Sequence, residues 1–277
     1  MLVTVMAPEI PVISLTTDFG LEDAYTGILK AVILSICAKA RLVDLTHNIP
    51  AFDVGAAAWI LANAYPHFPA GTVHLAVVDP QVGSQQRGLL IVADNHLFVG
   101  PDNGIFSQIV RHKHPVKVYE LVESRFWRKP VSTTFHARDI YGPVAAQLAC
   151  GQEPESVGPP LSADEIILLP EPAFIRKARS IVAEVVYEDS FGNLVTNIPA
   201  DLVPQDACVS LESVRIGCVS RSYFSAGRKG QLVAIFGSHG FLEIGAFKAS
   251  ASKLAKAGRG SCVSLSWDGD AQAVEDS

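Results

Sequence analysis

Hydrophobic and polar positions follow two different patterns along this chain. From residue 11 to about residue 150, short β-rich apolar runs alternate with longer segments of helical character. Strands that alternate with helices are typical of a layered domain whose sheet is largely parallel, so this half is predicted to be an α/β domain. The runs are VISL (12–15), AYTGILKAVILSI (24–36), RLVDLTH (41–47), DVGAAAWILANAYPHF (53–68) and GTVHLAVVD (71–79).

The end of this half has a different pattern. Residues 88–104, GLLIVADNHLFVGPDNG, contain two short apolar runs joined by Asp94-Asn95, a pair that tolerates left-handed backbone conformations. We predict a β-hairpin there, and a helix in DIYGPVAAQLAC (139–150). Residues 151–172 are rich in proline, glycine and acidic residues, as in a linker. We therefore place the domain boundary near residue 172, which gives domains 1–172 and 173–277.

The second half, residues 173–277, consists of short alternating runs separated by turn residues, among them IVAEVVYED, GQLVAIFG and CVSLSWD. This pattern is typical of a small all-β domain, a barrel or a sandwich. The last residues, GDAQAVEDS (269–277), are polar and are expected to be frayed.

The composition and charge of the chain argue against several classes of protein. The formal net charge of −6 argues against a broad nucleic-acid surface, which needs basic residues to neutralise phosphates. No 18-residue apolar run predicts a membrane span, and the N-terminus lacks the basic region of a signal peptide. The five cysteines are widely spaced without a CxxC motif, which suggests neither a disulfide framework nor a zinc knuckle. We expect a cytoplasmic protein.

Candidate chemistry follows the predicted strands of the first half. Asp18 lies in TTDFG, Asp79 in VVDPQVG and His136 in FHARDIYGP. Strand ends of an open parallel sheet converge on one crevice, so these loops are candidates for a shared site. TTDFG lacks the glycines of a phosphate loop, and a carboxylate there suits a sugar diol or a cation. For each aspartate alone, a turn or helix cap is the commoner role, and for His136 a buried structural histidine is as common as a catalytic one.

In the second half, Phe191 and Asn193 flank Gly192 in EDSFGN. An aromatic ring beside an amide suits the stacking and hydrogen bonding of a purine, but a hairpin turn explains the same residues. Ser238, in the glycine-containing segment GSHGFLEIG, suits a carboxylate ligand, and strand–turn–strand is the simpler interpretation.

The motifs together are more specific than any of them alone. In chain order they are TTDFG, LTHNIP, VVDPxVG, VGPDNG, FHxRDIYGP, DSFGNLVTNI and GxLEIG. Their set and order along nearly the whole chain resemble the S-adenosyl-L-methionine hydroxide adenosyltransferase family, relatives of the bacterial fluorinase and chlorinase. The resemblance implies an N-terminal α/β domain, a C-terminal β-barrel and a homotrimer with active sites between the N-terminal domain of one subunit and the C-terminal domain of its neighbour.

The resemblance also implies a reaction and its binding residues. S-adenosyl-L-methionine and water would give adenosine and L-methionine by displacement at C5′ of the ribose. Asp18 is expected to bind both ribose hydroxyls. The other expected substrate contacts are Asp189 to the methionine amine, Ser238 to its carboxylate, Phe191 and Asn193 to the adenine, and the backbone from Glu243 to Ala246 to the purine edge. No cofactor or metal is expected.

The family resemblance assigns the activation of water to an aspartate, an arginine and a histidine. Asp79 and His136 match the aspartate and the histidine. The family pattern usually has two adjacent basic residues after VVDPGVG, of which the first is catalytic, whereas this chain has Gln86 and then Arg87. We predict Arg87 as the catalytic arginine and leave open that Gln86 replaces it as a neutral donor.

Two alternative functions stay open at this point. The first is a halogenase that makes 5′-chloro-5′-deoxyadenosine, against which His136 argues because the halide-using relatives lack that histidine. The second, from another class, is a non-catalytic sensor of an adenosyl ligand, which Gln86 keeps open.

Overall fold

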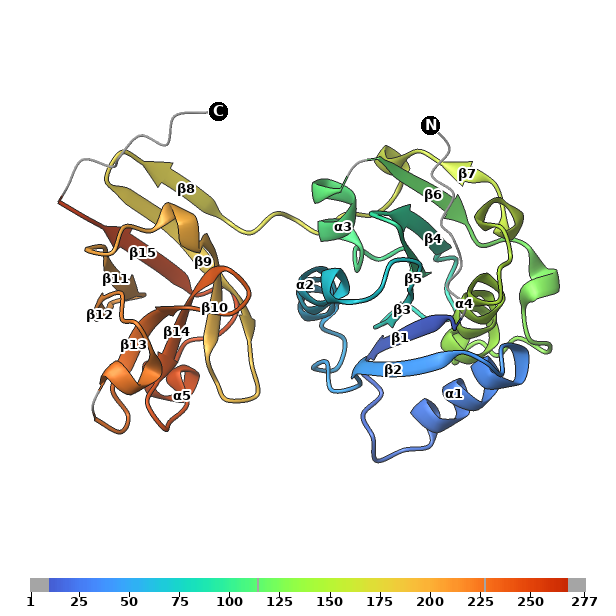
Figure 1. The fold of residues 1–277 in the computed structure, drawn as a ribbon, viewed down its shortest axis with the longest axis horizontal. Helices are drawn as coiled ribbons and strands as arrows, with labels where there is room; N and C mark the ends of the chain where they lie inside the picture. Colours follow the sequence, from blue (N-terminus) through green and yellow to red (C-terminus); the bar gives the residue numbers. More distant parts are fainter. Residues whose placement is uncertain (1–9, 114, 227, 269–277) are drawn as a thin grey trace. The chain divides into compact units, whose positions relative to one another are not determined.

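The computed structural model describes residues 10–113, 115–226 and 228–268. The chain divides into two compact units, Met1–Leu169 and Pro170–Ser277, and each contains its own sheet (Figure 1). The terminal segment 269–277, predicted to be frayed, lies outside the described residues. Within the described residues, no helix is long and apolar enough to cross a membrane.

The first unit contains a seven-stranded sheet in the order β2-β1-β3-β5-β4-β6-β7. The first four strands run parallel, and the last three are added by antiparallel pairing. The predicted α/β architecture is confirmed, with a mixed sheet because β4 and β5 form a hairpin. The strands are β1 (Val12–Thr17), β2 (Arg41–Thr46), β3 (Val73–Val77), β4 (Gly88–Ala93), β5 (His96–Pro101), β6 (Val116–Glu120) and β7 (Pro160–Leu161).

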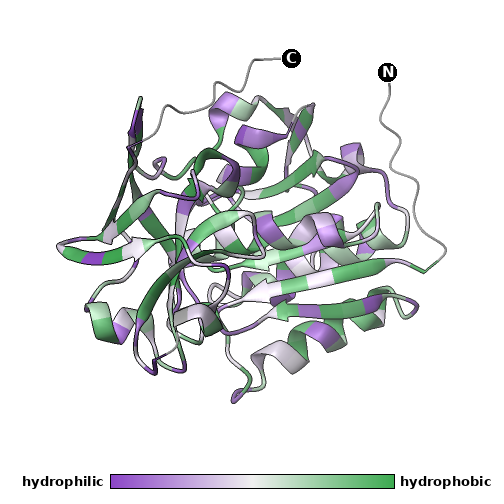
Figure 2. Ribbon diagram, turned by 60° about the vertical axis from the view of Figure 1, so that its left-hand side comes forward, coloured by the Kyte–Doolittle hydropathy of each residue, from purple (hydrophilic) through white to green (hydrophobic). Residues whose placement is uncertain are grey.

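Helices cover both faces of this sheet. Helices α1 (Tyr25–Ile36) and α4 (Gly142–Ala149) pack together on one face, and α2 (Val54–Ala64) and α3 (Ser107–His112) lie on the other (Figure 1). Figure 2 shows the apolar residues concentrated in the strands between them. Leu29 and Ile33, four positions apart on α1, are fully buried, as the helical period requires.

The predicted hairpin is confirmed at β4 and β5. Asp94 and Asn95 connect the two strands with φ angles of 50° and 60°, the left-handed conformation that a two-residue hairpin turn requires. Aspartate and asparagine tolerate this conformation better than most residues, so the turn could be predicted from the sequence.

The segment after α4 is only partly a linker. The backbone N–H of Ile167 donates to the Asp102 carboxylate at 2.8 Å, and the N–H of Leu169 donates to Ser107 Oγ at 2.7 Å. Residues up to 169 are thereby fastened to the first unit. Proline and acid content predicted a linker, but the buried Asp102 and Ser107 of the first unit hold its residues 167 and 169 in place.

The expectation that the cysteines form no disulfide is wrong for one pair. Cys37, at the end of α1, is bonded to Cys150, at the end of α4, with the Cα atoms 5.9 Å apart. The two residues are 113 positions apart in sequence, so no local spacing pattern signals them. The bond joins the C-terminal ends of the two helices that cover one face of the sheet.

The second unit is an antiparallel, nearly closed barrel, as predicted. Its strand order is β12-β11-β15-β9-β10-β14-β13, with β8 paired to β9. A bridge between Val219 and Ala234 connects the end of β12 to β13 and brings the two edges together. The strands are β8 (Phe174–Lys177), β9 (Ser180–Glu188), β10 (Leu194–Pro199), β11 (Cys208–Leu211), β12 (Val214–Cys218), β13 (Leu232–Phe236), β14 (Phe241–Ala246) and β15 (Cys262–Ser266), with a short helix α5 (Ala251–Ala255).

Two buried histidines lie side by side in the sheet of the first unit. His74 Nδ1 and Ser14 Oγ are 2.6 Å apart, and His74 Nε2 is 3.1 Å from His96 Nδ1. His74 has no exposed surface. Burial, with a smaller contribution from the His96 charge, lowers the pKa of His74 to about 3, so the ring stays neutral at physiological pH.

The buried His74 predicts acid sensitivity. In the unfolded chain His74 is protonated below about pH 6.5, whereas in the folded chain it is protonated only below about pH 3. The free energy of unfolding therefore decreases as the pH falls from 6.5 to 3. The loss attributable to this group is about 3–5 kcal/mol. We expect urea unfolding to show a flatter dependence on pH between 6.5 and 3 for His74→Gln than for wild type.

His112 provides the matched control, because it is a histidine on the surface whose ring is hydrogen-bonded to Gln108. The His112→Ala curve should run parallel to the wild-type curve. Equal slopes for wild type and His74→Gln would show that His74 does not carry the acid sensitivity.

Candidate active site

The candidate site of the first unit lies where the order of the parallel strands reverses. Strand β1 has β2 on one side and β3 on the other, and Thr17 of β1 is paired with Val77 of β3. Asp18 directly follows β1, and Asp79 follows β3 by two residues. Ligands of open α/β sheets bind at such a switch point, outside the carboxyl ends of the strands. The chain therefore presents two carboxylates at this position.

The side chain of Asp79 is half-buried. Burial raises its pKa above the ordinary value, and the nearby charge of Asp18 raises it further. The amide Nε2 of Gln86 donates to Asp79 Oδ1 at 3.0 Å, and the backbone N–H of Gln81 donates to the same oxygen at 3.2 Å. These bonds and the neighbouring His136 act in the opposite direction but do not cancel the effect of burial. Asp79, Asp18 and His136 thus interact electrostatically in one place.

A glycine brings the Asp79 loop against the His136 loop. Gly83 has a φ of +85°, and a Cβ atom there would overlap the carbonyl oxygen of Thr133. His136 follows three residues after Thr133 and precedes a π-helical turn, Ala137–Tyr141, that continues into α4. Such turns are rare and frequently occur at functional sites. The close backbone approach explains why VVDPQVG carries a glycine at this position.

A chain of hydrogen bonds fixes the turn that carries Asp18. Asp44 Oδ1 lies 3.1 Å from His47 Nε2, and His47 Nδ1 lies 2.8 Å from Thr17 Oγ1. Thr17 Oγ1 in turn accepts from the N–H of Phe19 at 3.3 Å. When Asp44 accepts from Nε2–H, the unprotonated Nδ1 of His47 accepts from the Thr17 hydroxyl. The Thr17 oxygen then accepts the hydrogen bond from the backbone N–H of Phe19. His47 lies in LTHNIP, but the sequence analysis assigned it no role; its position directly after the second strand is the signal that points to it.

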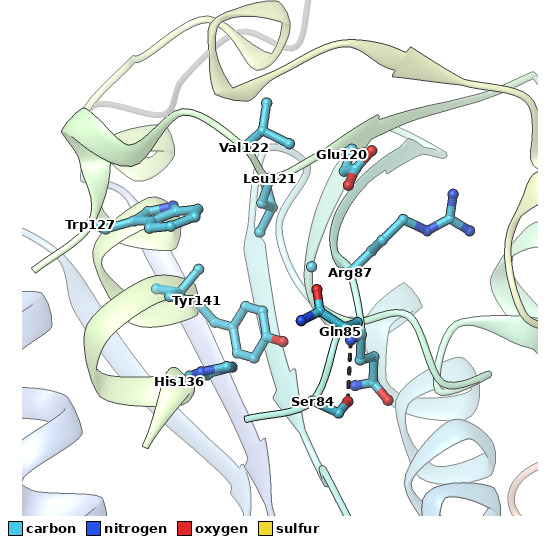
Figure 3. Close-up of a pocket in the computed structure, with 12 residues that line it drawn as sticks. Ser84, Gln85, Arg87, Glu120, Leu121, Val122, Trp127, His136 and Tyr141 are labelled. Atoms are coloured by element: carbon cyan, nitrogen blue, oxygen red, sulfur yellow. Dashed lines mark hydrogen bonds between the residues drawn. The ribbon is translucent and has the colours of Figure 1, made fainter. Parts of the chain in front are cut away.

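A pocket of about 240 Å³ is lined by His136 and Gln86, with neither Asp18 nor Asp79 among its lining residues (Figure 3). Tyr141 projects into the region between His136 and the 84–86 loop, and its ring lies 6.4 Å from the His136 ring. Burial, and then the charges of Asp79 and Asp102, raise the pKa of the Tyr141 hydroxyl, which therefore stays protonated as a donor. The residues that line the pocket are Ser84, Gln85, Gln86, Arg87, Gly88, Glu120, Leu121, Val122, Trp127, His136, Ile140 and Tyr141.

Gln86 and Arg87 face different partners. Arg87 donates to Asp102 Oδ2 through Nε at 3.1 Å and through Nη2 at 2.7 Å, and it also bonds the carbonyl of Glu165. Figure 3 shows its guanidinium on the side away from His136. The side chain that contacts Asp79 is the amide of Gln86. Gln86 and Arg87 directly precede β4, and their side chains reach partners on different segments, Asp79 and Asp102. The catalytic role of Arg87 stays a prediction, and the geometry favours Gln86 as the partner of Asp79.

The other charged residues of FHARDIYGP have a structural role. Asp139 is fully buried and accepts hydrogen bonds from Arg138, from Arg128 and from the backbone N–H of Ser132. Burial alone would raise the pKa of Asp139, but these bonds outweigh it and hold the pKa below its ordinary value. They fix the segment on which His136 lies.

In the second unit, Asp189 organises the turn between β9 and β10. Its Oδ1 accepts from the backbone N–H groups of Phe191 and Asn193, both at 2.9 Å, and its Oδ2 accepts from the Asn193 side chain at 2.9 Å. The predicted hairpin is confirmed, with Gly192 at φ +79°. Phe191 is 77% exposed, so its ring is available to stack on a ligand. The binding roles of these three residues stay predictions.

Strand β14 places the other predicted contacts of this unit nearby. Glu243 is paired with Val195 of β10 and accepts a hydrogen bond from the hydroxyl of Tyr223. Burial raises the pKa of Tyr223, which the sequence did not single out; the hydrogen bond to Glu243 and then the nearby charge of Asp189 raise it further. Ala246, at the end of β14, is buried, and Ser238 lies in the exposed turn before this strand. Each unit therefore contains its own cluster of predicted site residues.

No group of three or more histidine, cysteine, aspartate or glutamate side chains is placed to hold a metal ion within residues 10–113, 115–226 and 228–268.

Comparison with known proteins identifies the family. The model of the SAM hydroxide adenosyltransferase N-terminal domain matches residues 13–158, and that of the C-terminal domain matches residues 183–264. The chain belongs to the SAM hydroxide adenosyltransferase family. Both models cover the segments that carry the two clusters of site residues.

Relatives of this adenosyltransferase family member extend over most of the chain. It is 40% identical to the (R)-S-adenosyl-L-methionine hydrolase of Salinispora tropica over 190 residues, and this alignment covers 68% of this chain and 72% of the relative. It is 34% identical over 260 residues to the hydrolase of the same name from Methanocaldococcus jannaschii, 88% of this chain and 91% of the relative. The fluorinase of Nocardia brasiliensis is more distant, at 24% identity over 84% of this chain and 89% of the relative. The crystal structure of an uncharacterized conserved protein from Thermotoga maritima superposes with a TM-score of 0.86 at 32% identity, covering 92% of this chain and 100% of the other.

The different partners of Gln86 and Arg87 predict different effects on stability. Arg87→Ala leaves the Asp102 carboxylate, which is 2% exposed, without its guanidinium and should lower the free energy of unfolding by about 2 kcal/mol or more. Gln86→Ala removes an amide from a half-buried carboxylate and should cost about 1 kcal/mol or less. Both values are measured by urea unfolding.

Arg125→Ala serves as the control, because Arg125 is 63% exposed and lies 4.0 Å from Glu123. This variant should unfold like wild type. If Arg87→Ala is as stable as Arg125→Ala, the Arg87–Asp102 pair is not the structural contact described above.

Proposed function

We propose that this chain hydrolyses S-adenosyl-L-methionine to adenosine and L-methionine. The family and the names of its most similar relatives support this reaction. The single observation that carries it is the half-buried Asp79, which interacts with both Asp18 and His136 at the switch point of the sheet. The substrate is a sulfonium cation with a ribose diol and no phosphate, and an acidic strand-end loop suits such a ligand.

The reaction is an in-line displacement at C5′ of the ribose. Water attacks, the bond from C5′ to sulfur breaks, and L-methionine leaves as a neutral thioether that needs no acid. The site must therefore hold one water in line and accept its proton. A carboxylate whose pKa is raised by burial is a better base than an ordinary one, and this is the role proposed for Asp79. His136 orients the water, and Asp18 binds the ribose hydroxyls.

In the proposed site, Gln86 holds the carboxylate of Asp79 in place through the amide hydrogen bond. A neutral amide orients the carboxylate without removing its negative charge. Arg87 is less suited to contact the water because its guanidinium is engaged by Asp102. Positioning of this kind accounts for a large part of catalysis in reactions that need little covalent chemistry.

The second unit is proposed to bind the rest of the substrate. Phe191 and Asn193 contact the adenine together with the backbone from Glu243 to Ala246. Asp189 contacts the amine of the methionine, and Ser238 contacts its carboxylate. We further propose a homotrimer in which each active site combines the first unit of one subunit with the second unit of its neighbour. Sedimentation velocity tests the trimer separately from the reaction.

The reaction products distinguish the proposed function from its alternatives. Purified protein is incubated with S-adenosyl-L-methionine of either sulfonium configuration, with and without chloride, and the nucleosides are separated by chromatography. We expect adenosine and L-methionine in equal amounts, independent of chloride. A chlorinated nucleoside would indicate a halogenase. Substrate that binds but stays unchanged would indicate a sensor, and both of these results contradict the proposal.

His136 and Asp18 should affect different kinetic constants. His136→Ala should reduce kcat by about 10²–10⁴ with little change in the dissociation constant, because orienting water matters mainly in the transition state. Asp18→Ala should raise the half-saturating concentration about tenfold or more, because the ribose contact is made in the ground state as well. Single-turnover kinetics and calorimetry separate the two effects. A His136→Ala variant that loses binding but retains the rate of bound substrate would assign His136 to binding.

A further inference from the structure

Two cysteines face each other across a pair of strands in the second unit. Cys208 begins β11 and Cys218 ends β12, and the two residues are direct partners in the antiparallel register. Their sulfur atoms are 4.0 Å apart. Val209 and Leu211 of β11 are fully buried in the barrel core, so the alternation along the strand places Cys208 on the outer face. The proposed function uses neither thiol.

The backbone geometry at this position is that of a disulfide. Direct partners in an antiparallel pair have Cα atoms about 4.5–5.5 Å apart, within the range of about 4.4–6.8 Å that disulfides span. The two sulfur atoms are already in contact, so side-chain rotation alone can bring them to bonding distance. Cys208 is partly exposed and Cys218 is exposed, so a small reagent can reach the pair.

Arg215 adds a charge to this pair. It lies on β12, and its Nη2 is 4.0 Å from Cys208 Sγ. A thiolate that forms at Cys208 therefore has a guanidinium beside it, which is the environment of reactive thiols. A metal site is less suitable here, because the described residues supply no third histidine, cysteine or carboxylate around these sulfurs.

We propose that Cys208 and Cys218 form a redox-active dithiol that low-molecular-weight disulfides oxidise to a cross-strand disulfide. The Cys208 thiolate attacks the external disulfide, forms a mixed disulfide and releases one small thiolate. The Cys218 thiolate then attacks Cys208 Sγ, closes the protein disulfide and releases the second small thiolate. The external disulfide is reduced by two electrons, the dithiol is oxidised by two, and the two cysteine protons end on the two released thiols.

The bond would form next to the seam of the barrel. Cys218 directly precedes Val219, which makes the bridge to Ala234 of β13, and the N–H of Ser220 donates to the carbonyl of Ala234 at 2.8 Å. Joining β12 to β11 at this point ties the closing strand to the rest of the barrel. Amide hydrogen exchange at Ser220 should therefore slow on oxidation, by about threefold or more, because opening of the seam then has to move two strands together.

Glutathione provides the test on the whole 277-residue chain. After equilibration with oxidised and reduced glutathione at several ratios, thiols are blocked and peptides are mapped by mass spectrometry. We expect a Cys208–Cys218 link without bound glutathione. Cys208→Ser should leave Cys218 carrying glutathione, and Cys218→Ser should leave Cys208 carrying it. Arg215→Ala should slow the first step several-fold.

Cys262 is the internal control, because it is an exposed, free thiol on β15. It should accumulate glutathione, and Cys262→Ser should form the Cys208–Cys218 link like wild type. Circular dichroism confirms that each variant is folded. If wild-type Cys208 and Cys218 both retain glutathione as Cys262 does, without a link, the proposal is wrong. The result does not depend on the proposed hydrolase activity.

Discussion

A carboxylate held half out of water at the end of a parallel strand determines the chemistry available to the first unit. The Gln86 amide and the backbone of its own turn hold Asp79 by hydrogen bonds, and the loop that carries His136 lies close to it. The last contact requires Gly83, because any side chain there would overlap Thr133. The close approach of the Asp79 loop to the His136 loop therefore depends on backbone packing at Gly83. The ends of β1 and β3 carry Asp18 and Asp79, and Gly83 allows the loop after β3 to pack against the loop that carries His136.

Much of this arrangement follows from the sequence. Alternating strands and helices predict the α/β unit, and the convergence of strand ends predicts that Asp18 and Asp79 lie together. The turn pair Asp94-Asn95 and the acidic turn at Asp189 are local features, for which residue chemistry specifies backbone conformation directly. Predictions of this kind succeed because the determining interactions lie within a few residues.

The features that the sequence did not reveal depend on contacts between distant residues. The Cys37–Cys150 bond joins helix ends that are adjacent only after the sheet has formed. The acidic and proline-rich stretch after α4 is fastened to the first unit by Asp102, which no composition argument anticipates. The partner of Asp79 is decided by which way two adjacent side chains point. Composition specifies which residues can make such contacts, and only the fold specifies which of them do.

The neutral amide at Gln86 has a consequence for product departure. Asp18 and Asp79 place two carboxylates at the strand ends, and Asp79 is bonded by the neutral Gln86 amide while Arg87 is bonded to Asp102, so this region favours a ligand that carries positive charge. In the proposed reaction the sulfonium loses its charge when the bond to C5′ breaks. Adenosine and the methionine thioether then lack the charge that held their precursor, so the electrostatic attraction ends with the chemical step. A site of this composition would distinguish substrate from products by charge as well as by shape.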